Sequence, residues 1–332
     1  MNLVHLLVMG MLVSGQAYSA RTHLVIITGI GGTIDHTEAF TDLGLQLADA
    51  AEEHYGMVRD DIYYFAEKPE MFPDRIHSRS TREQIESCLH ELAETVGIKD
   101  RILIVLIGHG SYDEEEAKFN LPGPDLSASD FSLLLDSFGA RSLALVNCAS
   151  SSGAFIEELS KPGRIIITAT RSGRERNETV FARFFVEAFA DEEADLDKDE
   201  RISLLEAFEY SRRLTSDYYE KGKQILTEHA LLDDNGDGEG STEVDFEEGD
   251  GLLARSFYLE SDPAAALSGQ SDRLSPELTA LYQNRREIQN RIEAHRIRKN
   301  EIDPDVYLKE HEQMLLDLAR INQEIRRLGG GR

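Results

Sequence analysis

A histidine and a cysteine stand near the ends of two apolar runs of the sequence. Residues 102–111, ILIVLIGHGS, contain His109, and residues 142–153, SLALVNCASSSG, contain Cys148. Apolar runs rich in β-branched residues are typical of parallel strands that are buried on both faces. Reactive groups collect outside the carboxyl ends of such strands, so we predict that His109 and Cys148 lie at one edge of a sheet. A thiol beside an imidazole has the chemistry of a nucleophile with its proton acceptor.

Each of these two residues, taken singly, is more often structural than catalytic. A cysteine that follows a strand is commonly a small buried side chain. The pairing of the two blocks, with Gly or Ser beside both side chains, favours catalysis. The helix predicted after Cys148 would also lower the pKa of its thiol through the helix N-terminus. The other cysteine, Cys88, is spaced for one helix face with Ile85 and Leu89, and we predict that it is a core residue.

Strands and helices alternate along the part of the chain that must position the pair. This alternation predicts an α/β domain in three layers, with a mainly parallel sheet covered by helices on both faces. One predicted helix opens with a Ser-x-x-Asp capping pattern at Ser127. The glycines at 29–32 lack the spacing of a dinucleotide loop, so we expect no organic cofactor. The predicted strands are 23–28, 61–66, 102–107, 142–147, 164–170 and 252–259, and the predicted helices are 35–56, 81–96, 127–138, 153–159 and 177–190.

Composition limits where the protein works and what it binds. The 332 residues carry a net charge of −27, which argues against nucleic acid as a partner. Residues 1–20 form an apolar stretch that ends in small residues, which predicts a secretory signal peptide; a buried strand or a retained anchor is the alternative. No later stretch has the length of a membrane span, so we expect an exported protein, periplasmic or secreted, without an integral membrane segment in the mature chain.

An acidic segment has the spacing of an EF-hand calcium loop. Carboxylates occupy places one, three, five and twelve, where alternate oxygens would surround one ion. The sixth place, which needs a positive φ, is Glu200 instead of glycine. A solvated acidic turn before a helix is the alternative. The candidate calcium ligands are Asp195, Asp197, Asp199, Arg201 and Glu206.

A second acidic segment lies in the sequence LLDDNGDGEGS. It has Gly238 at the turn but no clear closing glutamate, so a glycine-rich loop explains it equally well. The candidate calcium ligands here are Asp233, Asn235, Asp237 and Glu239.

The character of the chain changes near its C-terminus. Residues 261–273 are rich in small residues and are predicted to be a linker. Residues 274–328 carry two heptad-like patterns separated by Asp303-Pro304-Asp305, which predicts an antiparallel helical hairpin. Self-packing or docking on the domain is its favoured role, and a partner protein that binds the hairpin is the alternative.

The His and Cys blocks together resemble the paired signature of caspase-fold cysteine peptidases. Within that group the chain is most similar to the legumain-like branch, and to exported bacterial legumain-like proteins that carry the segments HGS, FNLPGPDL, TATRSG and TEHALLDDNGDG. The resemblance covers roughly residues 22–260. It implies a caspase-like three-layer fold for residues 21–260, with the hairpin outside it.

The resemblance also implies roles for single residues. Cys148 would be the nucleophile and His109 its proton-handling partner, with the backbone N–H groups of Gly110 and Cys148 facing the oxyanion. Thr170 and Arg171 match the place where the family builds part of its specificity pocket. The run Asn147-Cys148-Ala149-Ser150 replaces the acid-flanked Glu-Ala-Cys-Glu run of legumain, so its asparagine specificity does not carry over.

Two functions follow as expectations. The first is an exported cysteine endopeptidase that cleaves a peptide or protein substrate through an acyl-enzyme, stabilised by calcium. The alternative is a catalytically silent caspase-fold protein that binds calcium or a protein partner. The presence of both His109 and Cys148 favours the first.

Overall fold

Seven strands form the central sheet of the chain, in the order β10-β9-β8-β4-β1-β2-β3. The computed structural model describes residues 21–139, 142–244, 249–259 and 275–328. The sheet strands are β1 (Thr22–Thr28), β2 (Ile62–Ala66), β3 (Ser78–Arg79), β4 (Arg101–Ile107), β8 (Ser142–Asn147), β9 (Arg164–Thr168) and β10 (Leu231–Asp233). All neighbouring strands are parallel except β10, which runs antiparallel to β9.

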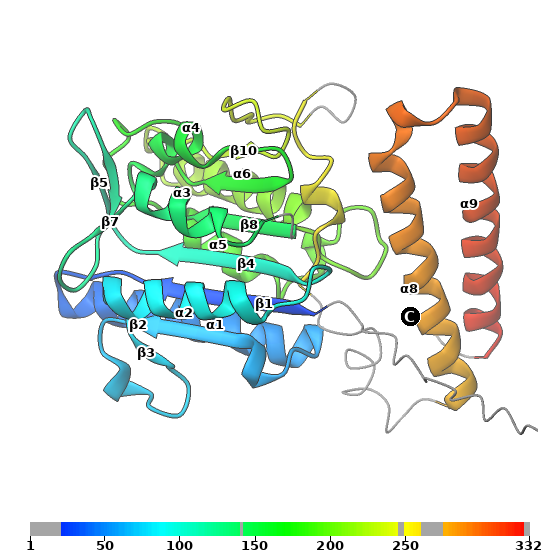
Figure 1. Cartoon of the computed structure of the whole chain (residues 1–332), viewed down its shortest axis with the longest axis horizontal. Coiled ribbons are helices and arrows are strands. Elements are labelled where there is room, and N and C mark those ends of the chain that lie inside the picture. The colour runs from blue at the N-terminus through cyan, green and yellow to red at the C-terminus, as the bar shows by residue number, and fades with distance from the viewer. Residues whose placement is uncertain (1–20, 140–141, 245–248, 260–274, 329–332) are drawn as a thin grey trace, which may run out of the picture.

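Helices cover both faces of this sheet (Figure 1). Along β4, alternate side chains enter two separate cores: Leu103, Val105 and Ile107 join the core that contains α1, α5 and α6, whereas the residues between them join the core of α2, α3 and α4. The prediction of a mainly parallel α/β sheet between helical layers is therefore confirmed. The helices are α1 (Ile34–Tyr55), α2 (Arg82–Thr95), α3 (Ala128–Asp136), α4 (Ile156–Leu159), α5 (Phe181–Ala188), α6 (Leu204–Lys221), α8 (Pro276–Ile297) and α9 (Pro304–Arg327).

A second, smaller sheet follows β4 directly. It consists of β5 (Gly110–Tyr112), β6 (Ala117–Phe119) and β7 (Leu126–Ser127), paired antiparallel in that order. Single-turn 3₁₀ helices join several of the longer elements. They are η1 (Arg59–Asp61), η2 (Pro69–Met71), η3 (Ser152–Phe155), η4 (Glu192–Ala194), η5 (Ala254–Ser256) and η6 (Lys299–Glu301).

The predicted strand at 252–259 is wrong. This segment holds η5, and its pairing is limited to one bridge between Tyr258 and Ser203. The predicted signal peptide and the linker at 261–273 fall outside the described residues. Among the described helices, none is both long enough and apolar enough to cross a bilayer.

The C-terminal helices α8 and α9 run side by side as a pair (Figure 1). They lie beside the edge from which β1 and β4 start, opposite the edge that carries β5. Helix α8 contacts the acidic loop before α6, because Arg285 forms an ion pair with Glu200 at 2.6 Å and Gln289 donates a hydrogen bond to the Asp199 carbonyl at 3.2 Å. The predicted helical hairpin is present, and it docks on the α/β domain.

Candidate functional site

Strands β4 and β8 are neighbours in the sheet, so the two predicted blocks do share its carboxyl edge. The last pair of their ladder joins Leu106 to Asn147. His109 and Ser150 each lie three residues beyond this pair, whereas Cys148 lies one residue beyond it. The Ser150 hydroxyl contacts Gly110, the residue next to His109, whereas the backbone N–H of Cys148 pairs with the Leu106 carbonyl.

Cys148 is buried inside the domain. Its residue is 1% exposed and packs in the core of α1, α5 and α6. Its N–H donates to the Leu106 carbonyl at 2.9 Å, which continues the ladder, and its carbonyl accepts a hydrogen bond from the Thr179 hydroxyl at 2.6 Å. Burial raises the pKa of the Cys148 thiol, and the charge of Glu228 adds to the effect.

The burial of Cys148 counts against its predicted roles, which stay predictions. A thiol that is shielded from solvent and held protonated is a poor nucleophile. An N–H that is already used in the ladder cannot stabilise an oxyanion. The expected lowering of the pKa by the following helix is also absent, because η3 begins at Ser152 and burial dominates.

Ser150 lies directly against the peptide that follows His109. Its hydroxyl accepts a hydrogen bond from the Gly110 N–H at 3.2 Å and donates one to the Gly110 carbonyl at 3.1 Å. A Cβ atom on residue 110 would overlap the Ser150 carbonyl oxygen, so glycine is needed for this approach. The next residue, Ser151, has a φ of 57°, and its N–H donates to the Glu175 carbonyl at 2.8 Å. The chain thus turns sharply after Ser150, which is 5% exposed and whose hydroxyl is held by Gly110.

The imidazole of His109 belongs to a short chain of polar groups. Its Nε2 lies 3.4 Å from Nδ1 of His36, and Nε2 of His36 lies 3.3 Å from Oε1 of Glu178. The ring of Phe40 packs edge-on against His109, with centroids 5.1 Å apart. Burial lowers the pKa of His109, and a positive charge on His36 would lower it further. At neutral pH the His109 ring is therefore neutral and able to accept a proton.

The sequence prediction did not include Ser150, His36 or Glu178. The sequence does contain a signal for His36, because this residue follows the first apolar strand closely. It lies in the first turn of α1, just after β1 ends at the same edge. Glu178 lies in the stretch between β9 and α5 and carries no local signal. It reaches the site only because this stretch crosses the carboxyl edge.

The two predicted substrate contacts differ in their surroundings. Thr170 is 0% exposed, and its hydroxyl accepts a hydrogen bond from the Gly153 N–H at 2.9 Å. Thr170 therefore supports the turn after β8 and does not contact substrate, which corrects the prediction. Arg171 is exposed, pairs with Glu175 at 3.1 Å, and lines a cavity of about 440 Å³ together with Tyr112 and Gly153. Its role in substrate binding stays a prediction.

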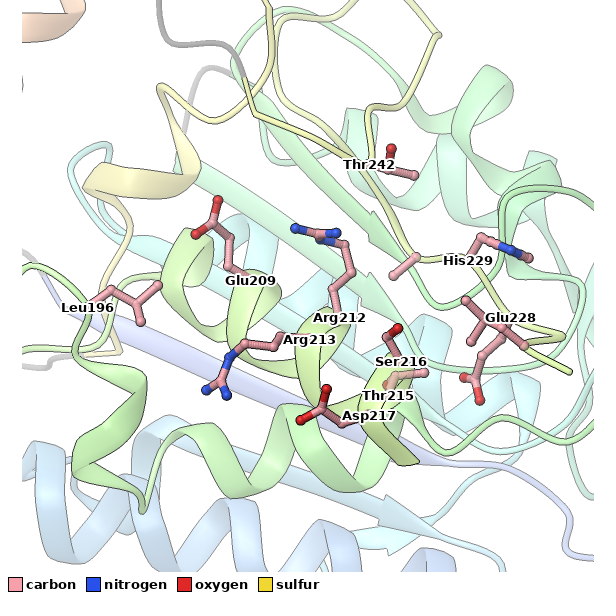
Figure 2. A pocket seen from close by; sticks show the side chains of 12 residues that line it. Leu196, Glu209, Arg212, Arg213, Thr215, Ser216, Asp217, Glu228, His229 and Thr242 are labelled. Carbon is pink, nitrogen blue, oxygen red and sulfur yellow. The ribbon is translucent and has the colours of Figure 1, made fainter. Parts of the chain in front are cut away.

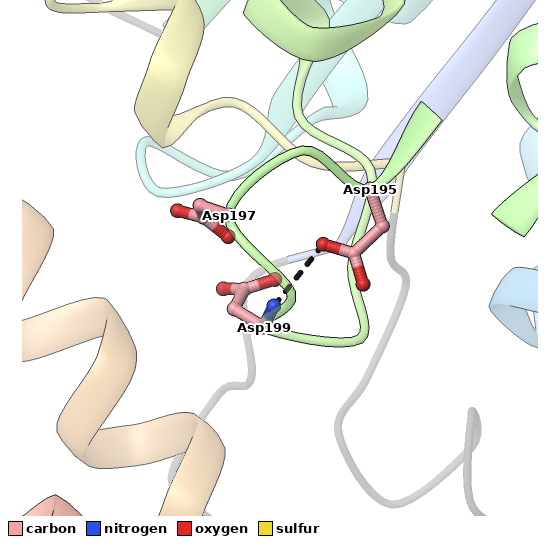
Figure 3. A group of neighbouring side chains, drawn as sticks. All are labelled: Asp195, Asp197 and Asp199. Carbon is pink, nitrogen blue, oxygen red and sulfur yellow. Dashed lines mark hydrogen bonds between the residues drawn. The ribbon is translucent and has the colours of Figure 1, made fainter. Parts of the chain in front are cut away.

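The first acidic loop, residues 195–206, brings three carboxylates together (Figure 3). Oxygens of Asp195, Asp197 and Asp199 lie within 4.8 Å of one another. Asp195 accepts hydrogen bonds from the N–H groups of Asp199 at 3.1 Å and Glu200 at 3.0 Å. Glu200 adopts the positive φ, 68°, that the sixth place requires. Burial raises the pKa of Asp199 to about 7, whereas the nearby charge of Arg201 lowers it.

The other two predicted ligands of this loop are engaged elsewhere. Glu206 caps α6: its Oε2 accepts from the Ser203 N–H at 2.8 Å and its Oε1 from the Leu196 N–H at 3.0 Å. The Arg201 guanidinium stacks on the ring of Tyr258 at 3.3 Å. The three aspartates could therefore hold a metal ion, and the side chains of Glu206 and Arg201 make other contacts.

The second acidic loop forms internal turns. Asp233 accepts hydrogen bonds from the N–H groups of Gly236 at 3.1 Å and Gly238 at 3.2 Å, and Asn235 accepts one from Asp237 at 2.8 Å. Across the described ranges, the aspartates of the first loop are the single group of three or more His, Cys, Asp or Glu side chains close enough to share a metal. The calcium site predicted from Asp233, Asn235, Asp237 and Glu239 is therefore not supported, because these groups satisfy one another and the local backbone.

Comparison with known proteins does not identify a family for this chain. No family model matches the chain, and no curated protein matches it. Among solved structures, the crystal structure of protein GSU0716 from Geobacter sulfurreducens is similar, with 11% sequence identity and a TM-score of 0.40. The similarity covers 64% of this chain and 92% of that one, and so low a TM-score carries no inference about the site.

Proposed function

We propose that the protein is an exported hydrolase that cleaves peptide bonds through an acyl intermediate on Ser150. The observation that carries the proposal is the position of the Ser150 hydroxyl, whose oxygen lies 3.2 Å from the nitrogen of Gly110, the residue next to His109. A nucleophile, a neutral base and a backbone N–H donor are the minimum parts of an acyl-transfer site. The caspase-like, legumain-like character implied by the sequence is part of this proposal, with serine in the place of the expected cysteine.

The reaction begins when the Ser150 hydroxyl turns from the Gly110 carbonyl toward His109. His109 takes the hydroxyl proton as the oxygen attacks the substrate carbonyl carbon. The Gly110 N–H, which donates to the Ser150 hydroxyl in this structure, is released when that hydroxyl turns away and then stabilises the negative charge that develops on the carbonyl oxygen. His109 then gives its proton to the leaving amine as the C–N bond breaks, and water, deprotonated by His109, releases the acid from Ser150.

In this scheme His36 and Glu178 support His109, which is the base. A protonated His109 would carry a positive charge beside His36, and the Glu178 carboxylate, 3.3 Å from His36, offsets that charge. The pair thus positions the imidazole of His109 and stabilises its protonated form. Neither residue contacts the reacting atoms.

We also propose that calcium binds the three aspartates of the first acidic loop and stabilises the fold. Asp195, Asp197 and Asp199 would hold the ion, which supplies neutralisation of like charges in a partly buried site. The loop contacts α8 through Gln289 and Arg285, so its stability and the docking of the hairpin are linked.

The second candidate function is a catalytically silent scaffold. It is favoured by one observation: the Ser150 hydroxyl uses its single proton on the Gly110 carbonyl, so no proton points at His109. In a silent protein this arrangement would be a structural clamp between β4 and the turn after β8. The first acidic loop would then bind calcium for stability or partner binding alone.

A peptide-cleavage experiment separates the two. The purified chain is incubated with a mixed peptide library in calcium-containing buffer, and the products are identified by mass spectrometry. We expect cleavage by the wild type, by Cys148→Ala and by Ser151→Ala, the matched neighbour. Ser150→Ala should lose about 10⁴-fold or more in rate, as removal of a nucleophile does in other acyl-enzymes.

Two results would overturn the assignment. If every folded variant and the wild type leave the library intact, the protein is better described as a silent scaffold. If Cys148→Ala is inactive while Ser150→Ala still cleaves, the nucleophile is the cysteine after all.

A further inference from the structure

We propose that the cavity between α6 and the segment 226–242 binds a small organic carboxylate with an apolar body. The cavity has a volume of about 550 Å³. Its walls include Leu196, Leu226 and Ala230, with Arg212, Thr215 and Thr242 as polar groups. This ligand site is separate from the Ser150 centre, and binding there does not depend on catalysis.

Arg212 is the first group that points to an anionic ligand. It is half-buried on α6, and its side chain extends into the space between the helix and the segment that carries His229 and Thr242 (Figure 2). Its Nε is shielded from solvent and has no hydrogen-bond partner within the described chain. A planar guanidinium in this state is suited to take a carboxylate from a ligand.

Thr215 is the second such group, and it is independent of the first. It lies one turn along α6 from Arg212, is 4% exposed, and lines the cavity. Its Oγ1 has no hydrogen-bond partner among the residues described. Buried polar atoms in folded proteins are nearly always paired, so an unpartnered hydroxyl near an unpartnered guanidinium Nε indicates a missing acceptor.

The carboxylates of the cavity limit the charge that a ligand can carry. Glu228 is committed to the fold, because it accepts hydrogen bonds from the N–H groups of Val180 at 2.8 Å and Phe181 at 3.1 Å. Glu209 precedes Arg212 by one turn and also lines the cavity. Two arginines and three carboxylates line the cavity, but Asp217 lies 3.6 Å from Lys221 and the Arg213 guanidinium lies over the ring of Tyr210 at 5.4 Å. The pair that remains for a ligand, Arg212 and Glu209, matches a single carboxylate better than a doubly charged phosphate. The leucine and alanine side chains then provide the surface for a hydrocarbon body.

The test uses three probes that share one alkyl chain and differ in the head group: octanoate, octanol and octylamine. Binding to the full chain is measured by isothermal titration below the micelle concentration. We expect saturable binding of octanoate, with octanol at least tenfold weaker and no binding of octylamine. Arg212→Gln should weaken octanoate at least tenfold and Thr215→Val about threefold. Arg183→Gln, an exposed arginine on α5, is the matched control and should bind like the wild type.

Three results would overturn the proposal. They are no octanoate binding by the wild type, equal binding of octanoate and octanol, and wild-type affinity in Arg212→Gln. If Arg212→Gln does not fold, the affinities of the wild type and of Thr215→Val for the three probes still test the proposal. Because binding is read directly, the same results are expected whether or not the protein proves to be a hydrolase.

Discussion

Replacement of Cys148 by alanine is expected to leave hydrolysis intact and to weaken the fold by a small, predictable amount. The thiol is 1% exposed and packs among apolar side chains, so its removal leaves a cavity of one sulfur atom. A cavity of about 25 Å³ costs about 0.6 kcal/mol, and the lost transfer of a methylene-sized group costs about 0.8 kcal/mol. The free energy of unfolding should therefore fall by about 1–2 kcal/mol, or about 3–6 °C in Tm.

A serine at the same position gives a sharper version of this prediction. Cys148→Ser places a hydroxyl in the apolar site, which adds about 1–3 kcal/mol to the destabilisation if the hydroxyl finds no partner. Urea unfolding of both variants measures these differences, with Cys88→Ala as the control for loss of a thiol. Burial raises the pKa of Cys88 to about 12, so neither thiol should be labelled quickly by iodoacetamide at neutral pH in the native state.

Three results would contradict this prediction. If Cys148 is alkylated in the native protein faster than Cys88, or if folded Cys148→Ala loses hydrolysis, the thiol is not a sealed core group. A fall in stability larger than about 4 kcal/mol would show that Cys148 contributes more than its packing.

Three further predictions follow from the described contacts. Calcium at about 100 times its Kd should stabilise the fold by about 2.7 kcal/mol, and hence raise Tm by about 5–10 °C; a shift that persists in Asp199→Asn, or no shift at all, would exclude calcium binding by this loop. Burial lowers the pKa of His23 in the folded chain, so the unfolded chain takes up that proton first as pH falls below about 6.5. The stability of the wild type should therefore drop relative to His23→Gln between pH 7.5 and 5.5 in urea titrations, and a constant difference would contradict this. Gly110→Ala should cost about 1–3 kcal/mol and abolish hydrolysis, because the new Cβ overlaps the Ser150 carbonyl; wild-type Tm and activity would be the opposing result.

The sequence predicted the parts of the fold whose residues must be apolar on both faces. Strands β1, β4, β8 and β9 are buried throughout, or nearly so, and their runs of Ile, Leu and Val reflect that environment directly. The capping pattern at Ser127 is also realised as a reciprocal pair of hydrogen bonds with Asp130. These features depend on local sequence, so local sequence was sufficient to find them.

The proposed nucleophile could not be identified in the same way, because its contacts form only in the folded chain. Cys148 and Ser150 are two residues apart, and both follow the same apolar run. The structure distinguishes them, because the Ser150 hydroxyl contacts Gly110 beside His109, whereas Cys148 lies in the core. Strands such as β5 and β10, three residues each, were also missed because so short a segment has no detectable periodicity.

Covalent labelling can identify the proposed nucleophile without knowledge of the substrate. The wild type, Ser150→Ala and His109→Ala are treated with a fluorophosphonate, which reacts with activated serine hydroxyls, and the modified residue is located by peptide mapping. The proposed site predicts one adduct per chain on Ser150, absent from Ser150→Ala and strongly slowed in His109→Ala. An unlabelled wild-type protein that is folded, or an adduct on another residue, would contradict a nucleophile at this edge of the sheet.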